Sequence, residues 1–252
     1  MAQTIDSNGE GVTPAMMRLF VAAQIAFVTL ALILATRVIA GSLEHGIVWM
    51  IPLAAVVGLV VADFVSGMVH FLADNFFAAD TPLIGPTFVR PFREHHADPL
   101  AITTHGFVHA NGGNTLVSLP VIAPMALLVP IENSPLATLV GALTLFFIIP
   151  IWLTNQIHKW AHMPAPPPVA RFLQRLGVIL ANEHHDVHHK SPFDTYYCIT
   201  VGLWNPLLER LNFFERLERF IRRWVPFTDP ISRVERDAMG RTVVPSTVSR
   251  AT

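Results

Sequence analysis

A run of four histidines within six residues, HHDVHH at 184–189, is the clearest chemical signal in the sequence. Positions three and four apart share one face of a helix, so one helical turn could direct several of His184, His185, His188 and His189 to the same side. The run is internal and broken by Asp and Val, which excludes a purification tag. We interpret it as a set of metal ligands.

Two further pairs have helical spacing. His158 and His162 are four residues apart, with Asn155 on the same stripe, and His70 and Asp74 repeat this spacing. Such pairs lie about 6 Å apart on a helix surface and can converge on one ion. The spacing therefore predicts two ligand-bearing helix ends.

Every histidine except His45 falls in or near such a group, and we interpret His45 as an ordinary polar residue. The remaining candidates are His95, His96, His105 and His109. A structural zinc site needs four protein ligands and a catalytic one needs three, so this chain has a surplus. A surplus of imidazoles with few carboxylates suits two first-row metal ions, and zinc has no redox chemistry. The set therefore favours O2 activation at iron.

Nearby carboxylates are candidates for orienting the metal-bound histidines. A ligating imidazole commonly donates its other N–H to a carboxylate or carbonyl. Asp63, one heptad before His70, is such a candidate, whereas Asp74 could instead be a direct ligand. The other candidates are Glu94, Asp98, Glu183 and Asp186. Glu94 and Asp98 could equally form salt bridges with Arg90 or Arg93.

Four apolar segments must position these residues. They cover about residues 17–40, 47–77, 115–131 and 136–162, and several approach the 20 residues that a helix needs to cross a bilayer. The second and fourth end in the polar turns that carry His70 and His158. The sequence therefore predicts an all-α membrane protein with about four transmembrane helices and a histidine-rich cap.

The distribution of basic residues predicts the orientation. The connecting turns GSLEHG and PIENSP contain no Lys or Arg, whereas most Lys and Arg follow the second and fourth segments. By the positive-inside rule, both termini and all the histidine clusters are cytoplasmic, with Arg37 as a minor exception. This topology fits a bacterial inner membrane, or the endoplasmic reticulum of a eukaryote.

Composition excludes other classes. The 252 residues are 52% apolar, with a formal net charge of -1, so nothing points to nucleic acid. The single cysteine, Cys198, excludes an internal disulfide and a Cys-rich zinc module. We predict a disordered tail over residues 1–15, one membrane domain over 16–227 and a second tail over 228–252.

Two amphipathic segments are predicted near the headgroups. VARFLQRLGVILA at 169–181 reads as a short interfacial helix leading into the HHDVHH run. A second helix is predicted from Asn205 and Pro206 to Trp224, with arginines interleaved among its apolar residues. It could face anionic lipid or pack on the protein with a solvated basic side.

Five blocks of sequence resemble the plasmanylethanolamine desaturases, membrane enzymes that introduce the vinyl-ether double bond of plasmalogens. Their relatives include a plant plastid desaturase that acts on phosphatidylglycerol acyl chains. The resemblance covers about residues 55–220. The blocks are DFVSGMVH at 63–70, RPFREHHADPLAITTHGF at 90–107, NGGN at 111–114, NQIHKWAH at 155–162 and HHDVHHKSPFDTYYCIT at 184–200.

This resemblance implies a two-iron, O2-dependent lipid desaturase. Its substrate would be a 1-O-alkyl (plasmanyl) ethanolamine phospholipid, and its electrons would come from a cytochrome b5-like protein or a ferredoxin. His109 falls where the family has no histidine. The positions that match the family's histidines are His70, His95, His96, His105, His158, His162, His184, His185, His188 and His189.

Three alternatives stay open. Acyl-lipid desaturation and hydroxylation use the same oxidant and differ in how the second hydrogen is positioned. A non-enzymatic metal-binding or transport protein is a third, although transport favours polar groups near the bilayer midplane and here they gather at one rim.

Overall fold

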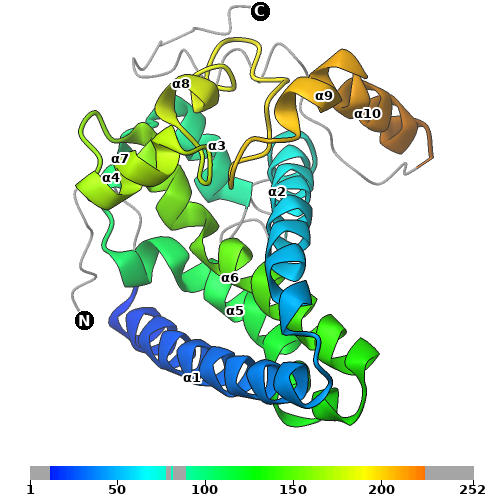
Figure 1. The fold of residues 1–252 in the computed structure, drawn as a ribbon. Coiled ribbons are helices and arrows are strands. Elements are labelled where there is room, and N and C mark those ends of the chain that lie inside the picture. The colour runs from blue at the N-terminus through cyan, green and yellow to red at the C-terminus, as the bar shows by residue number, and fades with distance from the viewer. Residues whose placement is uncertain (1–11, 78–80, 82–88, 225–252) are drawn as a thin grey trace, which may run out of the picture. The chain divides into compact units, whose positions relative to one another are not determined.

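The computed structural model describes residues 12–77, 81 and 89–224, without the side chains of 90, 93 and 94. These residues form helices and connecting turns with no β-strand, which confirms the all-α prediction (Figure 1). The chain divides into two compact units, residues 1–66 with 105–159 and residues 67–104 with 160–252. The predicted tail at 228–252 and most of that at 1–15 lie outside the described residues.

The first unit contains the long apolar helices. α1 spans Pro14–Glu44 and, after a 3-10 turn at Val48–Met50, α2 spans Ile51–Asn75. α6 spans Pro135–His162, and both α2 and α6 continue into the second unit. Within the described part of the chain, three helices are long and apolar enough to cross a membrane: Pro14–Glu44, Val48–Asn75 and Pro135–His162. The predicted membrane fold is confirmed.

The third predicted segment, at about residues 115–131, differs from the other three. It lies in α5 (Phe107–Leu127), which begins before Thr115 with the polar sequence HANGGN and contains Pro120 and Pro124. The polar start explains why α5 is not among the helices that meet the length and apolarity required of a span. The apolar part that the sequence suggested is therefore only the later portion of a longer helix.

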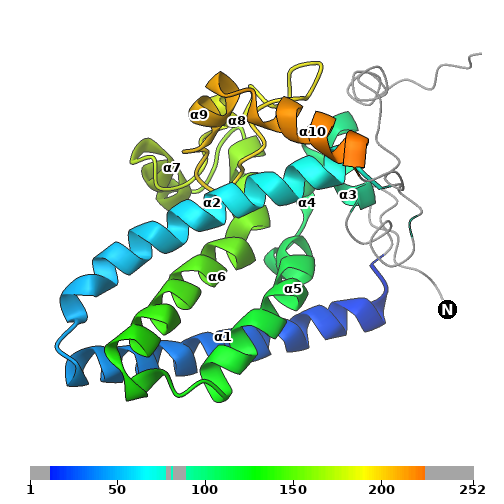
Figure 2. The ribbon, with the colours of Figure 1, turned by 90° about the vertical axis from the view of Figure 1, so that its right-hand side faces the viewer.

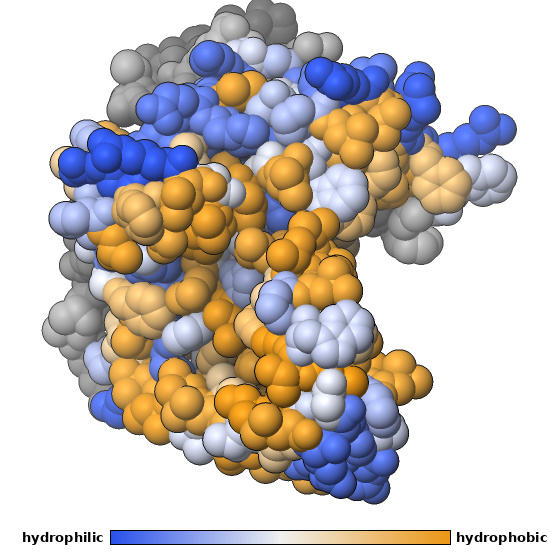
Figure 3. All heavy atoms as spheres, in the orientation of Figure 1, coloured by the Kyte–Doolittle hydropathy of each residue, from blue (hydrophilic) through white to orange (hydrophobic). Residues whose placement is uncertain are grey.

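Apolar packing joins the helices of the first unit. α1 packs against α5 (Figure 2), and Phe27, Leu34 and Ile122 are completely buried in a core that also contains residues of α2 and α6. Outward-facing side chains of these helices are also apolar, while polar side chains gather near the C-terminal end of α1 and the α5–α6 connection, at the lower right of Figure 3. Helices that are apolar both in their buried core and on their outer surface are expected where lipid surrounds the protein.

Arg37 binds the α5–α6 connection at that end. Its guanidinium donates to Glu132 at 2.6 Å and to the main-chain carbonyls of Ala126 and Val129 at 2.8 Å. His45 binds the same connection. Its Nε2 lies 2.7 Å from the main-chain carbonyl of Glu132, in the 3-10 turn Ile131–Asn133. These bonds satisfy carbonyls left open where α5 ends. Arg37 and His45 thus have structural partners here.

The second unit consists of short helices around the ends of α2 and α6. They are α3 (Arg90–Ala97), α4 (Ala101–Thr104), α7 (Pro168–Arg175), α8 (Asn182–His185), α9 (Asn205–Arg210) and α10 (Phe213–Trp224). An aromatic cluster forms part of its core: Phe71, Tyr197 and Phe214 have ring centroids 4.8–5.4 Å apart. This cluster packs α10 and the segment after the histidine run against the end of α2.

The two predicted amphipathic segments contain helices, but the first helix is shorter than predicted and the second segment is divided. α7 ends at Arg175, followed by Gly177 at a φ of 66°. The single helix predicted from Asn205 to Trp224 is wrong in one respect, because it is broken into α9 and α10 at Asn212, whose φ is 47°. Asparagine tolerates this left-handed conformation better than most residues, so the chain can turn there.

Candidate metal centre

One polar cluster in the second unit surrounds the end of α2. It consists of His70, Asp74, His96 and His188, whose ligand atoms all lie within 4.8 Å of one another. Asp74 Oδ2 lies 2.9 Å from His96 Nε2, 3.2 Å from His70 Nε2 and 3.6 Å from His188 Nε2. We call this set the aspartate cluster. All four residues are buried, so three imidazoles and one carboxylate share a volume that excludes water.

Main-chain carbonyls orient two imidazoles of the aspartate cluster. Nδ1 of His70 lies 3.0 Å from the Tyr197 carbonyl, and Nδ1 of His188 lies 2.7 Å from the Thr195 carbonyl. A carbonyl only accepts, so each Nδ1 carries the proton and each Nε2 presents a lone pair toward Asp74. This is the tautomer that a metal ligand requires.

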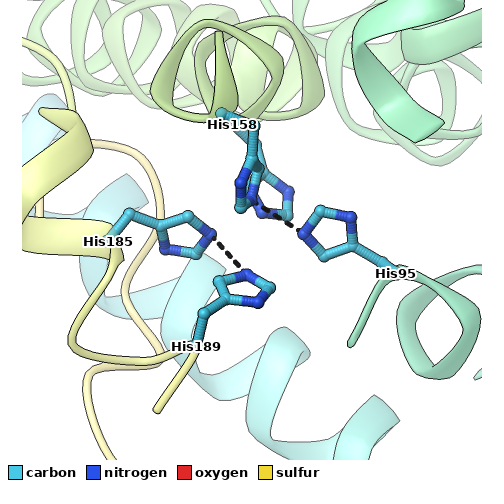
Figure 4. Close-up of side chains that lie close together, drawn as sticks. His95, His158, His185 and His189 are labelled. Atoms are coloured by element: carbon cyan, nitrogen blue, oxygen red, sulfur yellow. Dashed lines mark hydrogen bonds between the residues drawn. The ribbon is translucent and has the colours of Figure 1, made fainter. Parts of the chain in front are cut away.

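A second cluster contains imidazoles alone. Within the second unit it consists of His95, His162, His185 and His189, whose ligand atoms also lie within 4.8 Å of one another. His95 Nε2 lies 2.8 Å from His162 Nε2, and His185 Nε2 lies 3.1 Å from His189 Nε2. Figure 4 shows the His185 and His189 rings turned toward each other. We call this set the histidine cluster.

α6 supplies the histidine cluster from its last turn. His158 lies one turn before His162 on this continuous helix, and both side chains are buried. The predicted common helix face for this pair is therefore confirmed. Asn155, predicted on the same stripe, donates through Nδ2 to the Ala110 carbonyl at 2.8 Å, which ties α6 to α5 within the first unit.

Adjacent residues supply different clusters. His95 and His96 follow each other in α3, yet His95 belongs to the histidine cluster and His96 to the aspartate cluster. His188 and His189 divide in the same way. The ring centroids of His96 and His189 lie 5.2 Å apart. The two clusters are therefore neighbouring parts of one centre, built from shared segments of chain.

The donor atoms fit metal ions. Oδ1 of Asp74 is buried without a hydrogen-bond partner, which would be costly unless a cation were bound. Burial, and then the neighbouring His70, lower the pKa of His188 to about 4; burial and surrounding histidines also lower the pKa of His189. Both imidazoles are consequently neutral at physiological pH, as ligands must be. The arrangement suits two first-row metal ions.

His184 lies outside both clusters. Its Nε2 accepts a hydrogen bond from Asn205 Nδ2 at 3.1 Å, and its ring packs on Tyr196. Asn205 also bonds both main-chain groups of Cys198, at 2.9 and 3.0 Å. His184 is therefore placed to hold the chain after the histidine run, and the helical turn predicted for that run ends at His185.

His105 and Asp63, also predicted for the centre, belong to neither cluster. His105 stacks on His109 with ring centroids 4.1 Å apart, and its carbonyl accepts a bond from Lys159. Asp63 is fully buried on α2 two turns before His70. Their roles at a metal remain predictions.

The remaining carboxylate candidates lie at the surface where they are described. Asp98, Glu183 and Asp186 are exposed, and Asp98 accepts a bond from the main-chain N–H of Leu100. The side chain of Glu94 lies outside the described part. The orienting groups seen here are instead the carbonyls of Thr195 and Tyr197, which the sequence did not single out. A main-chain carbonyl leaves no residue-type signal.

Gly67 allows the Tyr197 carbonyl to reach His70. A Cβ on Gly67 would collide with Cys198 Sγ and lie 3.1 Å from Cys198 N, a main-chain atom that cannot rotate away. Gly67→Ala should push this segment outward, destabilise the fold by about 1–3 kcal/mol and weaken metal binding about 10- to 100-fold. Thermal denaturation and metal titration measure both effects. Gly113→Ala, which meets no atom within 4 Å, is the control. It should neither destabilise the fold nor weaken metal binding. Equal losses in the two variants would show that Gly67 does not have this role.

Comparison with known proteins matches the sequence of this chain to one family. Residues 59–228 match the lipid desaturase domain. The chain is 41% identical over 215 residues to plasmanylethanolamine desaturase of Myxococcus xanthus, covering 84% of this chain and 74% of that protein. It is 42% identical over 181 residues to plasmanylethanolamine desaturase 1 of Mus musculus, covering 69% of this chain and 65% of the mouse protein.

A more distant relative has a different name. The chain is 33% identical over 187 residues to fatty acid desaturase 4-like 1, chloroplastic, of Arabidopsis thaliana, covering 73% of this chain and 60% of that protein. No solved structure matches the chain significantly. Both clusters fall within the matched domain.

Proposed function

This chain belongs to the lipid desaturase family, and from that premise we propose that it forms the vinyl-ether double bond of plasmalogens from plasmanylethanolamine. It is an oxidoreductase with a lipid substrate and a histidine-rich site able to bind metal. The proposed cofactors are two iron ions, with O2 as co-substrate. The observation that carries the substrate is the identity above 40% to a bacterial and a mouse protein that bear this name.

The donor set supports a redox metal. Two neighbouring clusters with seven histidines and one aspartate in the second unit exceed what one zinc ion uses. Bound iron would supply the oxidant, made from O2, that removes hydrogen from an unactivated C–H bond. Imidazole accommodates iron as well as zinc and copper, so the metal's identity rests on the family and on the reaction.

The protein's own residues position this chemistry. The carbonyls of Thr195 and Tyr197 hold His188 and His70 in one tautomer, and Asp74 places a carboxylate among three imidazoles. Complete burial of His70 and His188 excludes bulk water, which protects a strong oxidant from side reactions. Because the ligands project from helices and bonded turns, the centre is held in place before substrate arrives.

The electron donor and the membrane orientation are also proposals. We infer a separate carrier, such as a cytochrome b5-like protein or a ferredoxin, because no flavin or haem motif is recognisable in the sequence. The three apolar helices make this a membrane protein. The excess of Lys and Arg beyond α2 and α6 supports cytoplasmic termini and a cytoplasmic centre.

Lipid analysis tests the proposed reaction. Cells that contain plasmanylethanolamine but lack vinyl-ether lipids should acquire vinyl-ether ethanolamine phospholipids when they express this chain. Mass spectrometry with acid hydrolysis measures this, because acid cleaves vinyl ethers and spares alkyl ethers. New double bonds in acyl chains alone would favour the acyl-lipid reaction suggested by the Arabidopsis relative's name. A hydroxylated alkyl chain without vinyl ether would instead favour hydroxylation.

A further inference from the structure

A cavity in the second unit opens beside the histidine cluster. Its volume is about 370 Å³, and its lining combines apolar and polar residues. The apolar walls come from Pro99, Leu100, Ala161 and Pro164, and the polar groups come from His162, Asn182, Asp186 and His189. Cavities of this size with mostly apolar walls and a few polar groups are typical of small-molecule and lipid-chain sites.

The cavity approaches one cluster and not the other. His162 and His189 of the histidine cluster line it, whereas no residue of the aspartate cluster does. His70 and His188 have no exposed surface at all. A molecule in this cavity would therefore meet the metal position of the histidine cluster, while the aspartate cluster stays closed behind it.

α7 connects the cavity rim to an apolar surface. Asn182, which lines the cavity, accepts a bond from Gln174 of α7 at 3.4 Å and donates to the Met163 carbonyl at 2.9 Å. Phe172 of α7 is 59% exposed, Leu176 directly after α7 is 60% exposed, and arginines of α7 are exposed as well. A short helix with exposed apolar and basic side chains is suited to the headgroup boundary of a membrane. Lipid would therefore lie next to the rim.

We propose that this cavity receives a hydrocarbon segment of the membrane lipid substrate and presents it to the histidine cluster. The assignment rests on the proposed lipid desaturation, and it adds the place where the hydrocarbon chain of the lipid binds. Apolar walls favour hydrocarbon over the headgroup, because burying an unpaired charge there would be costly. Leu100, 54% exposed, lies where the hydrocarbon would pass.

Cysteine protection tests the cavity directly. The full-length, metal-loaded protein carrying Leu100→Cys is treated with a maleimide in detergent without O2, so that no turnover occurs. The native Cys198 is fully buried and should not react. Added 1-O-hexadecyl plasmanylethanolamine, at about ten times its Kd, should slow labelling about tenfold by occupying the site. Glycerophosphoethanolamine, which has the headgroup and no chain, should leave labelling unchanged.

A matched variant controls for general effects of lipid. Leu203→Cys alters a leucine of the same unit that is 59% exposed and does not line the cavity, so its labelling should not change. A second variant, Leu100→Trp, should fill the cavity, raise the KM for lipid and retain full metal content. Equal protection at both cysteines, or no protection at position 100, would overturn the proposal.

The outcomes separate the cavity from the reaction. Vinyl-ether formation in cells without protection at position 100 would leave the proposed function standing and remove the cavity assignment. Protection by both plasmanyl and diacyl lipids, in a protein that forms no vinyl ether, would support the cavity and reject the proposed reaction.

Discussion

Asp74→Asn is expected to abolish vinyl-ether formation and to reduce bound metal by about one ion per chain. Asp74 is the only carboxylate in the aspartate cluster and lies within 3.6 Å of three imidazole nitrogens. The amide removes the negative charge and can place an N–H donor where a cation would bind. Vinyl-ether lipid per unit of protein, together with metal analysis of the purified variant, measures both effects.

Asp98→Asn is the matched control for this change. Asp98 is exposed and accepts a hydrogen bond from the Leu100 N–H, which an asparagine oxygen can also accept. Its activity and metal content should remain near those of the unaltered protein. A fully metallated, active Asp74→Asn variant would show that the aspartate cluster binds no essential ion.

His162→Ala should likewise eliminate activity, and His158→Ala should do the same. His162 Nε2 lies 2.8 Å from His95 Nε2, and its loss removes a nitrogen donor from a buried site built only of imidazoles. His158 occupies the preceding turn of the same helix face. Since the proposed O2 chemistry requires a redox ion, losing that ion should stop the reaction while the chain stays folded.

His184→Ala distinguishes a ligand from a neighbouring histidine. Because His184 bonds Asn205 and lies outside both clusters, its replacement should leave the metal content unchanged and lower stability by about 1 kcal/mol through the lost hydrogen bond. Activity normalised to protein abundance should persist, as it should in His109→Ala. If His184→Ala lost metal as His162→Ala is expected to, the conclusion that His184 is not a metal ligand would be wrong.

The sequence predicted the features that depend on local spacing. Four-residue spacing fixes a common helix face, so the positions of His70 with Asp74 and of His158 with His162 follow from the sequence alone. Long charge-free runs likewise located α1, α2 and α6, because a bilayer leaves few other structures for such segments. Motif resemblance added the family, which the comparisons confirmed.

What the sequence could not resolve depends on tertiary packing. Nothing local distinguishes His184 from His185, and the bond from Asn205 to His184 depends on tertiary packing. Helical spacing over the run at 184–189 could not reveal that α8 ends at His185. The Tyr197 carbonyl that orients His70 is a main-chain atom contributed from 127 positions further along the chain. The break at Asn212 depends on a single left-handed residue.

Metal analysis of the purified full-length protein is the most direct test of the central claim. Two neighbouring clusters of imidazole and carboxylate donors, in a member of a desaturase family, predict close to two iron atoms per chain when the protein is purified in detergent without chelator. Inductively coupled plasma mass spectrometry, with protein quantified by amino-acid analysis, gives this ratio. A ratio near two iron atoms supports the account; one zinc ion and no iron in an active preparation would contradict it.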